Sequence, residues 1–288
     1  MNTTLRPRRS VLYMPAANQR AMDKARSLDV DAVIFDLEDA VAPSAKEQAR
    51  AQACAQVRAG GYGHREVLIR VNGLHTPWGR SDFEAALDAR PDGIVLPKVE
   101  DVATLEHYRD RMNDVGTAIP LWPMIETPAG VSRVDQIAAQ DGVAVLVMGT
   151  SDLQKELRLP DTPDRQGLLY ALSRTVNAAR RHGRDVLDGV SAVLDDTEAF
   201  TRLCEQGRAL GFDGKTLVHP AQVAPANRVF GPTAQAVEHA RRVLAAWQAA
   251  EREGKGIAVL DGKMVENLHA ADAERVVAFA EAIAGRAG

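Results

Sequence analysis

Cysteine and aromatic residues are scarce in this sequence. Its 288 residues include only two cysteines, Cys54 and Cys204, and aromatic side chains make up 5% of the chain. Two cysteines cannot build a disulfide framework, and their separation matches no zinc-binding motif. The composition therefore argues against a disulfide-stabilised secreted domain, and we expect a cytoplasmic protein.

Long hydrophobic segments and an excess of charge of one sign are also missing. No apolar run approaches the ~20 residues that cross a bilayer, and the formal net charge is only −4. Such a balance gives no reason to expect nucleic acid or a membrane surface as a partner. The basic N-terminus MNTTLRPRRS is followed by VLYMPAAN, which is too short for the apolar core of a signal peptide.

Short apolar runs alternate with helical patterns along most of the chain, and 45% of the residues are hydrophobic. Eight runs are predicted as strands: Ser10–Pro15, Asp31–Leu37, Glu66–Val71, Gly93–Pro97, the runs ending at Glu126 and Asp152, Arg184–Leu187 and Lys215–Val218. Alternating strands and helices are typical of a parallel sheet. Eight such units fit a closed (β/α)₈ TIM barrel better than an open sheet.

Helices are expected between these strands. Five have both ends predicted, at Ala17–Ser27, Val102–Met112, Val131–Ala139, Pro163–Arg181 and Thr197–Leu210. Two more are expected, one that follows Ser44 and ends at about Ala59 and a short one that follows Ser81. Two of them carry the spacing of a capping box, in which a serine and a glutamate three residues later bond each other's backbone. These pairs are Ser44 with Glu47 and Ser81 with Glu84.

The pattern changes after residue 230. Thr233–Glu253 is predicted as one long helix, Ile257–Leu260 as a strand, and Leu268–Ala284 as a last helix that follows the turn GKMVEN. We therefore expect a barrel domain over residues 1–230 and a C-terminal helical lid or oligomerisation arm over residues 231–288. A purely structural packing arm is the alternative.

Charged residues recur where the predicted strands end. In a barrel of this type the function lies at the carboxyl ends of the strands, and the residues expected there are Asp36, Glu38, Asp39, Arg70, Lys98, Glu126, Asp152, Asp188 and His219. Glu126 and Asp152 close consecutive strands and should face each other across a short gap. Two carboxylates with open positions left over suit Mg²⁺ holding an oxygen-rich ligand. Either acid alone could instead be a solvated turn residue or a helix cap.

Two basic residues accompany the acids. Arg70 ends an apolar strand, where a guanidinium suits a carboxylate or carbonyl oxygen. Lys98 lies on the same rim, either with a direct role or in an ion pair with Glu100 or Glu126.

Eight segments in a fixed order give the chain a specific resemblance. They are RRSVLYMPAAN, VIFDLEDAV, IRVNG, VLPKVE, PMIETPAGV, MGTSDL, GFDGKTLVHPAQV and GKMVEN. Together they resemble the citrate lyase β-subunit-like family, which includes the malyl-CoA and citramalyl-CoA lyases. The resemblance implies a Mg²⁺-dependent carbon–carbon lyase on a TIM barrel, usually a homotrimer or hexamer. Such an enzyme cleaves a malyl-, citramalyl- or citryl-type 3-hydroxyacyl-CoA thioester to an acyl-CoA and a 2-oxo acid.

The resemblance also implies roles for residues of this chain. Glu126 and Asp152 match the metal ligands, and Arg70 matches the arginine that contacts the substrate carbonyl. Glu38 and Asp39 match acids in the outer shell of the metal, where we also place Lys98.

Further matches concern the thioester. Tyr13, Arg20 and Lys24 fall where the family contacts the CoA portion, and His219 and Pro220 fall near the thioester itself.

The catalytic acid/base of the family is usually an aspartate in the tail, delivered by a neighbouring subunit. Its position matches Glu266 here, with Asp261 as the rival. A second departure is the sequence Pro15-Ala16-Ala17-Asn18, where the family often has a glycine.

Other functions stay open within this resemblance. The chain could be a citrate lyase β subunit acting on an acyl-carrier-protein thioester, a synthase or thioesterase, or a non-catalytic CoA-binding protein. Glyoxylate, pyruvate and oxaloacetate are the candidate 2-oxo acids, and pocket shape decides among them.

Overall fold

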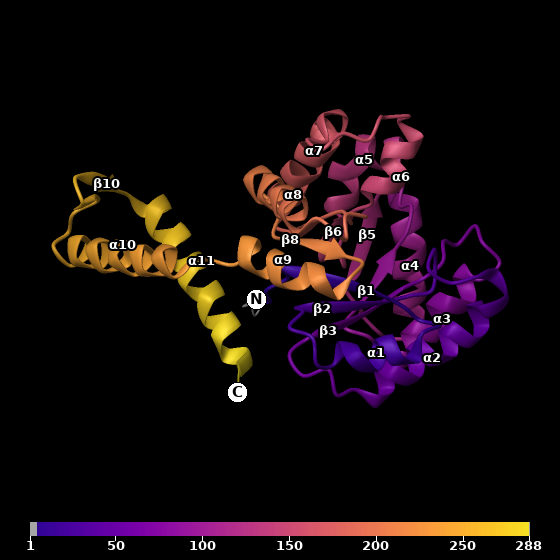
Figure 1. Cartoon of the computed structure of the whole chain (residues 1–288). Helices are drawn as coiled ribbons and strands as arrows, with labels where there is room; N and C mark the ends of the chain where they lie inside the picture. The colour runs from indigo at the N-terminus through magenta and orange to yellow at the C-terminus, as the bar shows by residue number, and fades with distance from the viewer. Residues whose placement is uncertain (1–4, 288) are drawn as a thin grey trace. The chain divides into compact units, whose positions relative to one another are not determined.

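The computed structural model describes residues 5–287, and these form two compact units. The barrel unit is Arg8–Asn227, and the tail unit comprises residues 228–287 together with residues 5–7. Helix α9 (Val223–Phe230) spans the boundary. Figure 1 traces both units along the chain.

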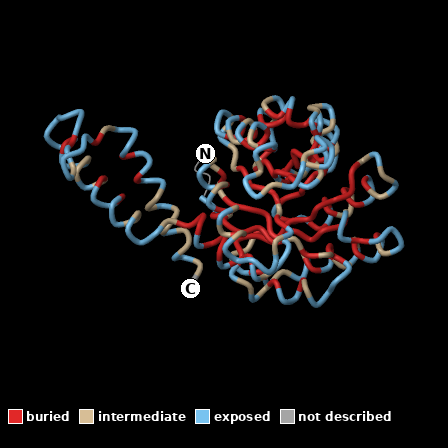
Figure 2. Tube along the Cα trace, turned by 45° about the horizontal axis from the view of Figure 1, so that its top comes forward, coloured by how far each residue is buried: buried red, intermediate tan, exposed pale blue. Residues whose placement is uncertain are grey.

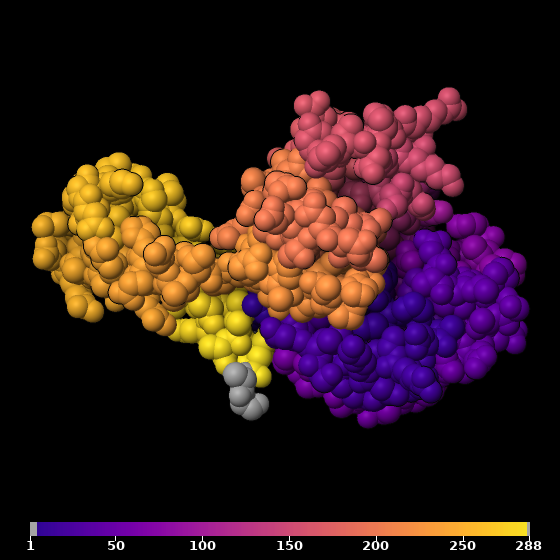
Figure 3. Space-filling view, viewed as in Figure 1, coloured from indigo at the N-terminus to yellow at the C-terminus, as the bar shows by residue number. Residues whose placement is uncertain are grey.

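Eight parallel strands close the barrel unit in the order β1 to β8, which confirms the predicted TIM barrel. The strands are β1 (Ser10–Pro15), β2 (Ala32–Asp36), β3 (Glu66–Arg70), β4 (Gly93–Leu96), β5 (Leu121–Ile125), β6 (Val145–Met148), β7 (Asp185–Asp188) and β8 (Gly214–Leu217). The first and last strands pair directly, with Ser10 opposite Lys215 and Leu12 opposite Leu217. In Figure 3 the same closure brings indigo atoms from the start of the barrel unit beside orange atoms from its end.

The strands are apolar because both of their faces are covered, as expected for a parallel sheet inside helices. Every residue of β2, β3, β4, β5, β6 and β8 is buried, and Figure 2 shows this red centre within a largely exposed outer layer. Val11, Ile34, Leu68 and Trp122 belong to the cluster that fills the barrel interior.

Helices surround the barrel and connect its strands. They are α1 (Gln19–Ala25), α2 (Lys46–Ala59), α3 (Gly79–Ala89), α4 (Val102–Asp114), α5 (Pro128–Ala138), α6 (Thr150–Glu156), α7 (Leu169–Arg181) and α8 (Thr197–Leu210). Asn18, Asp101, Thr127 and Asp196 cap four of them by accepting a hydrogen bond from a backbone N–H.

Both predicted capping boxes are wrong. A 3-10 turn at Pro43–Ala45 leads directly into α2, whose N-cap residue is Ala45, so Ser44 belongs to that turn. Helix α3 begins at Gly79, which places Ser81 inside the helix. The serine–glutamate spacing was present in both cases, but proline and the preceding loop determined where each helix starts.

The region after β6 also differs from the prediction. The helix expected from Pro163 begins only at Leu169, after a 3-10 turn at Gln166–Leu168. Helix α6 (Thr150–Glu156) and helix α9 were not predicted, because each is too short for its apolar period to be recognised in the sequence.

The tail unit consists of two helices and a hairpin. Helix α10 (Ala234–Arg252) is followed by β9 (Ala258–Leu260), β10 (Lys263–Val265) and α11 (Asn267–Ala284). The predicted turn GKMVEN is in part a strand, since β10 pairs antiparallel with β9. Ala240, Val243, Ala258, Val265 and Ala273 belong to a core of this unit's own. The role of this segment as lid or oligomer arm stays a prediction.

No helix among residues 5–287 combines the length and the apolar character needed to cross a membrane.

Candidate active site

A pocket of about 360 Å³ opens at the carboxyl ends of the barrel strands. Tyr13, Pro15, Asp36, Asp39, Ala40, Arg70, Met124, Glu126, Met148, Gly149, Thr150, Ser151, Asp152, Val190, Thr216 and Val218 line it. The structure therefore brings together six of the predicted residues, namely Tyr13, Asp36, Asp39, Arg70, Glu126 and Asp152. All of them belong to the barrel unit.

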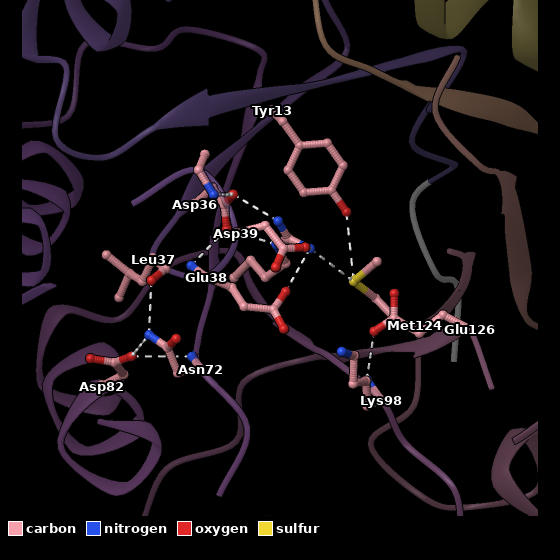
Figure 4. Close-up of polar contacts among 12 residues, drawn as sticks. Tyr13, Asp36, Leu37, Glu38, Asp39, Asn72, Asp82, Lys98, Met124 and Glu126 are labelled. Carbon is pink, nitrogen blue, oxygen red and sulfur yellow. Dashed lines mark hydrogen bonds and ion pairs between the residues drawn. The ribbon is translucent and has the colours of Figure 1, made fainter. Parts of the chain in front are cut away.

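Arg70, the last residue of β3, is held by carboxylates. Its Nε and Nη2 each donate to Asp36 at 2.7 Å, and its Nη1 lies 2.7 Å from Glu38 Oε2 and 3.6 Å from Asp39 Oδ2 (Figure 4). Burial alone would lower the pKa of Arg70, but Asp36 and Glu38 hold it well above the usual value. The guanidinium is thus a fixed positive charge with its fork already oriented.

Glu126 follows β5 directly and is only 4% exposed. Its Oε1 accepts a hydrogen bond from the backbone N–H of Lys98 at 2.7 Å. Burial, with a further contribution from Glu38, raises the pKa of Glu126 to about 8. This carboxylate therefore lies in surroundings that favour a nearby positive charge.

Asp152 does not close a strand as predicted. It lies in the first turn of α6, because β6 already ends at Met148. Its carboxylate pairs with Lys98 Nζ at 3.1 Å. The predicted ion pair of the Lys98 side chain with Glu100 or Glu126 was therefore wrong. Lys98 adopts a left-handed backbone (φ 49°) and contacts both acids, Glu126 through its N–H and Asp152 through its ammonium.

The two acids fit the requirements of Mg²⁺. Both lie within reach of Lys98, and among residues 5–287 no group of three His, Cys, Asp or Glu side chains is arranged to hold a metal. The protein would thus supply two carboxylates and leave the other positions to water or substrate, as is common for Mg²⁺.

Asp188 is not part of this pocket. Its carboxylate is fully buried and pairs with Lys215 Nζ at 3.0 Å and with Arg165 Nη1 at 2.8 Å. Although burial opposes the charged form, these two cations lower the pKa of Asp188. Asp188 does end a strand, β7, as expected, but its pairing with residues on β8 and before α7, which was not predicted, keeps it out of the pocket lining.

The other predicted thioester residues lie outside the pocket lining. Arg20 and Lys24 are exposed on α1. His219 is exposed as well, and its Nδ1 accepts a hydrogen bond from the N–H of Ala221 at 3.2 Å, at the start of the 3-10 turn that contains Pro220. Their contacts with a thioester stay predictions.

Lys46 is a residue of this region that the sequence analysis missed. It is 5% exposed, and its Nζ donates to Leu37 O at 2.7 Å, Glu38 O at 2.7 Å and Asn72 Oδ1 at 2.9 Å. All three ammonium protons are thereby used. Lys46 fixes the backbone that carries Glu38, and a lysine in a helical pattern gives no sequence signal of such burial.

Glu266 and Asp261 belong to the tail unit. Glu266 is the N-cap residue of α11, where its backbone carbonyl accepts from the N–H of His269 at 2.9 Å and its own N–H donates to His269 Nδ1 at 3.0 Å. Asp261 lies 2.5 Å from Arg242 Nη2 in an exposed ion pair. The helix-capping alternative for Glu266 is therefore present in the structure, and its catalytic role stays a prediction.

Comparisons with known proteins agree with this geometry. Residues 9–220 match the sequence model of the HpcH/HpaI aldolase/citrate lyase family. The chain is 48% identical over 278 residues to a (3S)-malyl-CoA thioesterase of Cereibacter sphaeroides, covering 96% of each, and 35% identical over 269 residues to the citrate lyase subunit beta of Escherichia coli, covering 91% and 89%. Protein CitE of Mycobacterium tuberculosis, solved with magnesium, acetoacetate and coenzyme A, is 26% identical with a TM-score of 0.77, covering 94% of this chain and 97% of CitE.

Proposed function

This chain belongs to the HpcH/HpaI aldolase/citrate lyase family, and we propose that it is a Mg²⁺-dependent enzyme of the lyase type acting on a 3-hydroxyacyl-CoA thioester. The malyl and citramalyl thioesters are the proposed substrate class, with an acyl-CoA and a 2-oxo acid as products. The observation that carries the proposal is the pocket that joins Arg70 with the acids Glu126 and Asp152. A homo-oligomeric state, trimer or hexamer, and a cytoplasmic location belong to the same proposal.

The residues in and around the pocket have different roles in carbon–carbon cleavage. Glu126 and Asp152 would hold Mg²⁺, whose chemistry here is to lower the pKa of the substrate hydroxyl and to polarise a carbonyl oxygen. Arg70 faces the oxygen on which negative charge develops, and Asp36 keeps its guanidinium oriented. Lys98 orients Glu126 through its backbone N–H. Glu38 completes the charged surroundings of Arg70.

A general acid is also needed, because the departing thioester enolate must be protonated on carbon. We assign this step to Glu266 from the tail of a neighbouring copy, as the family resemblance suggests. Glu266→Gln should abolish exchange of the acetyl-CoA methyl protons with deuterated solvent, measured with Mg²⁺ and a 2-oxo acid analogue present. Asp261→Asn is the matched control and should keep most of the exchange, since Asp261 pairs with Arg242.

Mixed oligomers test the sharing between copies. Glu266→Gln subunits mixed with Arg70→Ala subunits should regain part of the activity if one copy supplies the acid to another. Proven subunit exchange without recovery would confine the site to one chain, and normal proton exchange in Glu266→Gln would remove this residue from the mechanism.

Hydrolysis is the second candidate function, since a relative of high identity is named a (3S)-malyl-CoA thioesterase. Malyl-CoA distinguishes the two reactions: cleavage gives acetyl-CoA and glyoxylate, whereas hydrolysis consumes water and gives malate and free CoA. The experiment is a screen of malyl-, methylmalyl-, citramalyl- and citryl-CoA with Mg²⁺ and with a chelator, followed by identification of the products. We expect Mg²⁺-dependent formation of a 2-oxo acid.

Other outcomes of the screen favour the alternatives. Thioester hydrolysis without any 2-oxo acid would replace the lyase proposal by a thioesterase. Turnover of only an acyl-carrier-protein thioester would indicate a citrate lyase β subunit. Binding of acetyl-CoA with no turnover of any thioester would indicate a non-catalytic CoA-binding protein.

A further inference from the structure

Tyr13 occupies the interior of the barrel, among the residues that surround Arg70. It lies in β1, packs against the core cluster of the barrel and lines the pocket. The Arg70 guanidinium carbon lies 4.8 Å from the centroid of the Tyr13 ring, so the cation stacks over an aromatic face. Figure 4 shows the hydroxyl of Tyr13 directed toward the sulfur of Met124.

We infer that Tyr13 donates its hydroxyl to the 2-oxo acid half of the substrate, beside Arg70. The family resemblance instead implies that Tyr13 contacts the CoA portion. The inference rests on the proposed function and names one further residue that contacts the reacting half of the substrate.

The first argument is that the Tyr13 hydroxyl has only a weak hydrogen-bond acceptor, the sulfur of Met124. Tyr13 donates to Met124 Sδ at 3.7 Å, and Arg70 Nη1 points to the same sulfur at 3.8 Å. A thioether is a weak acceptor. The Tyr13 hydroxyl will therefore donate to a carboxylate or carbonyl oxygen when a ligand brings one, because bonds to charged acceptors are stronger. Arg70 Nη1 also lies 2.7 Å from Glu38 Oε2, so its charge is already paired and the hydroxyl is the donor that a ligand oxygen would gain.

The second argument is that the hydroxyl keeps its proton. Burial raises the pKa of Tyr13, and the partly opposing effect of Arg70 does not reverse this. A protonated phenol beside a guanidinium adds a neutral donor to a charged one, and the two together can hold two lone pairs of one carboxylate or one developing oxyanion.

The third argument separates Tyr13 from the residues expected at the CoA portion. Arg20 and Lys24 are exposed on α1 and do not line the pocket, whereas Tyr13 does. Tyr13 also shares the pocket with Arg70 and Glu126, the residues proposed for the reacting end. Its position therefore associates it with the small acid and not with the nucleotide.

Tyr13→Phe tests the inference, because it removes the hydroxyl and keeps the ring that stacks on Arg70. The control is Tyr170→Phe, the same chemical change at a residue on α7 that is 70% exposed and outside the pocket lining. Calorimetric titrations in Mg²⁺ measure two affinities separately, one for the 2-oxo acids glyoxylate and pyruvate and one for acetyl-CoA. Thermal unfolding of both variants checks that the fold is retained.

We expect Tyr13→Phe to weaken 2-oxo acid binding about tenfold to a hundredfold, the loss typical of a hydrogen bond to a charged group. Its affinity for acetyl-CoA should match that of Tyr170→Phe. Unchanged 2-oxo acid affinity, or a loss confined to acetyl-CoA, would overturn the inference while leaving the proposed function intact. A wild-type protein that binds no 2-oxo acid would instead overturn the proposed function, and the inference with it.

Discussion

Gly149 stands directly behind the carboxylate of Glu126, and replacing it by alanine should displace that carboxylate. A Cβ at position 149 would lie 2.2 Å from Glu126 Oε2 and 2.4 Å from Glu126 Cβ, where ordinary contact begins at 3.4 Å. The backbone of Gly149 has φ −103°, which alanine adopts readily, so the effect comes from this contact and not from backbone strain. Glu126 must therefore move by about 1 Å.

A displacement of about 1 Å at a catalytic group can cost about a hundredfold in rate, or about 2.7 kcal/mol in the barrier. We expect kcat of Gly149→Ala to fall by about that factor, with a higher Mg²⁺ concentration needed for half-maximal activity. The assay is steady-state turnover of the best thioester substrate over a Mg²⁺ titration.

The matched control is Gly256→Ala, since a Cβ at that position would meet nothing within 4 Å. Gly256→Ala should retain the wild-type kcat, and unfolding of both variants by heat reports any loss of the native state. Wild-type kcat and an unchanged Mg²⁺ requirement in Gly149→Ala would refute the role assigned to Glu126.

Four further substitutions test the site and its support. Glu126→Gln and Asp152→Asn should each raise the Mg²⁺ concentration needed for activity while the fold persists, and full activity of both in chelator-treated buffer would show that the metal lies elsewhere. Arg70→Lys keeps the positive charge but loses the two parallel hydrogen bonds to Asp36, so kcat should fall by about a hundredfold. An unchanged kcat with a lower melting temperature would show that Arg70 only forms a structural ion pair. Lys46→Met leaves three buried acceptors without their donor and should lower the free energy of unfolding by about 2–4 kcal/mol in a urea titration, whereas unchanged stability would mean that water replaces the ammonium.

The barrel could be predicted from the sequence because its strands are buried on both faces. A run such as AVIF in β2, before Asp36 at its end, must be apolar when helices cover one side and the barrel interior the other, and that requirement leaves a visible pattern. Arg70 and Glu126 were predictable for a related reason, since charged residues at the end of such a run have few positions other than the rim.

Features that depend on contacts distant in sequence could not be predicted in the same way. Asp188 looked like Asp36 in the sequence, but Lys215 and Arg165, which neutralise it, come from other segments. Tyr13 likewise has no sequence signal that connects it with Arg70 on β3. Such pairings arise only when the strands are arranged around the barrel.

The hairpin of the tail unit was a local signal that was overlooked. Asp261 and Gly262 both have positive φ, 51° and 75°, and they form a two-residue connection between β9 and β10. An Asp-Gly pair between short apolar segments is a strong hairpin indicator. The turn was instead expected at GKMVEN, so the pairing of Lys263–Val265 with β9 was not predicted.

The pairing of β1 with β8 has a consequence for the way this protein is made. Ser10 is translated before its neighbour Lys215, which leaves the ribosome only after the seven strands β1 to β7 have been translated. Until then β1 and the newest strand each carry an edge of unpaired N–H and C=O groups, which is where other chains can add by strand pairing. A nascent chain halted before Leu217 should therefore aggregate far more readily than the finished protein, in which barrel closure pairs both edges with each other.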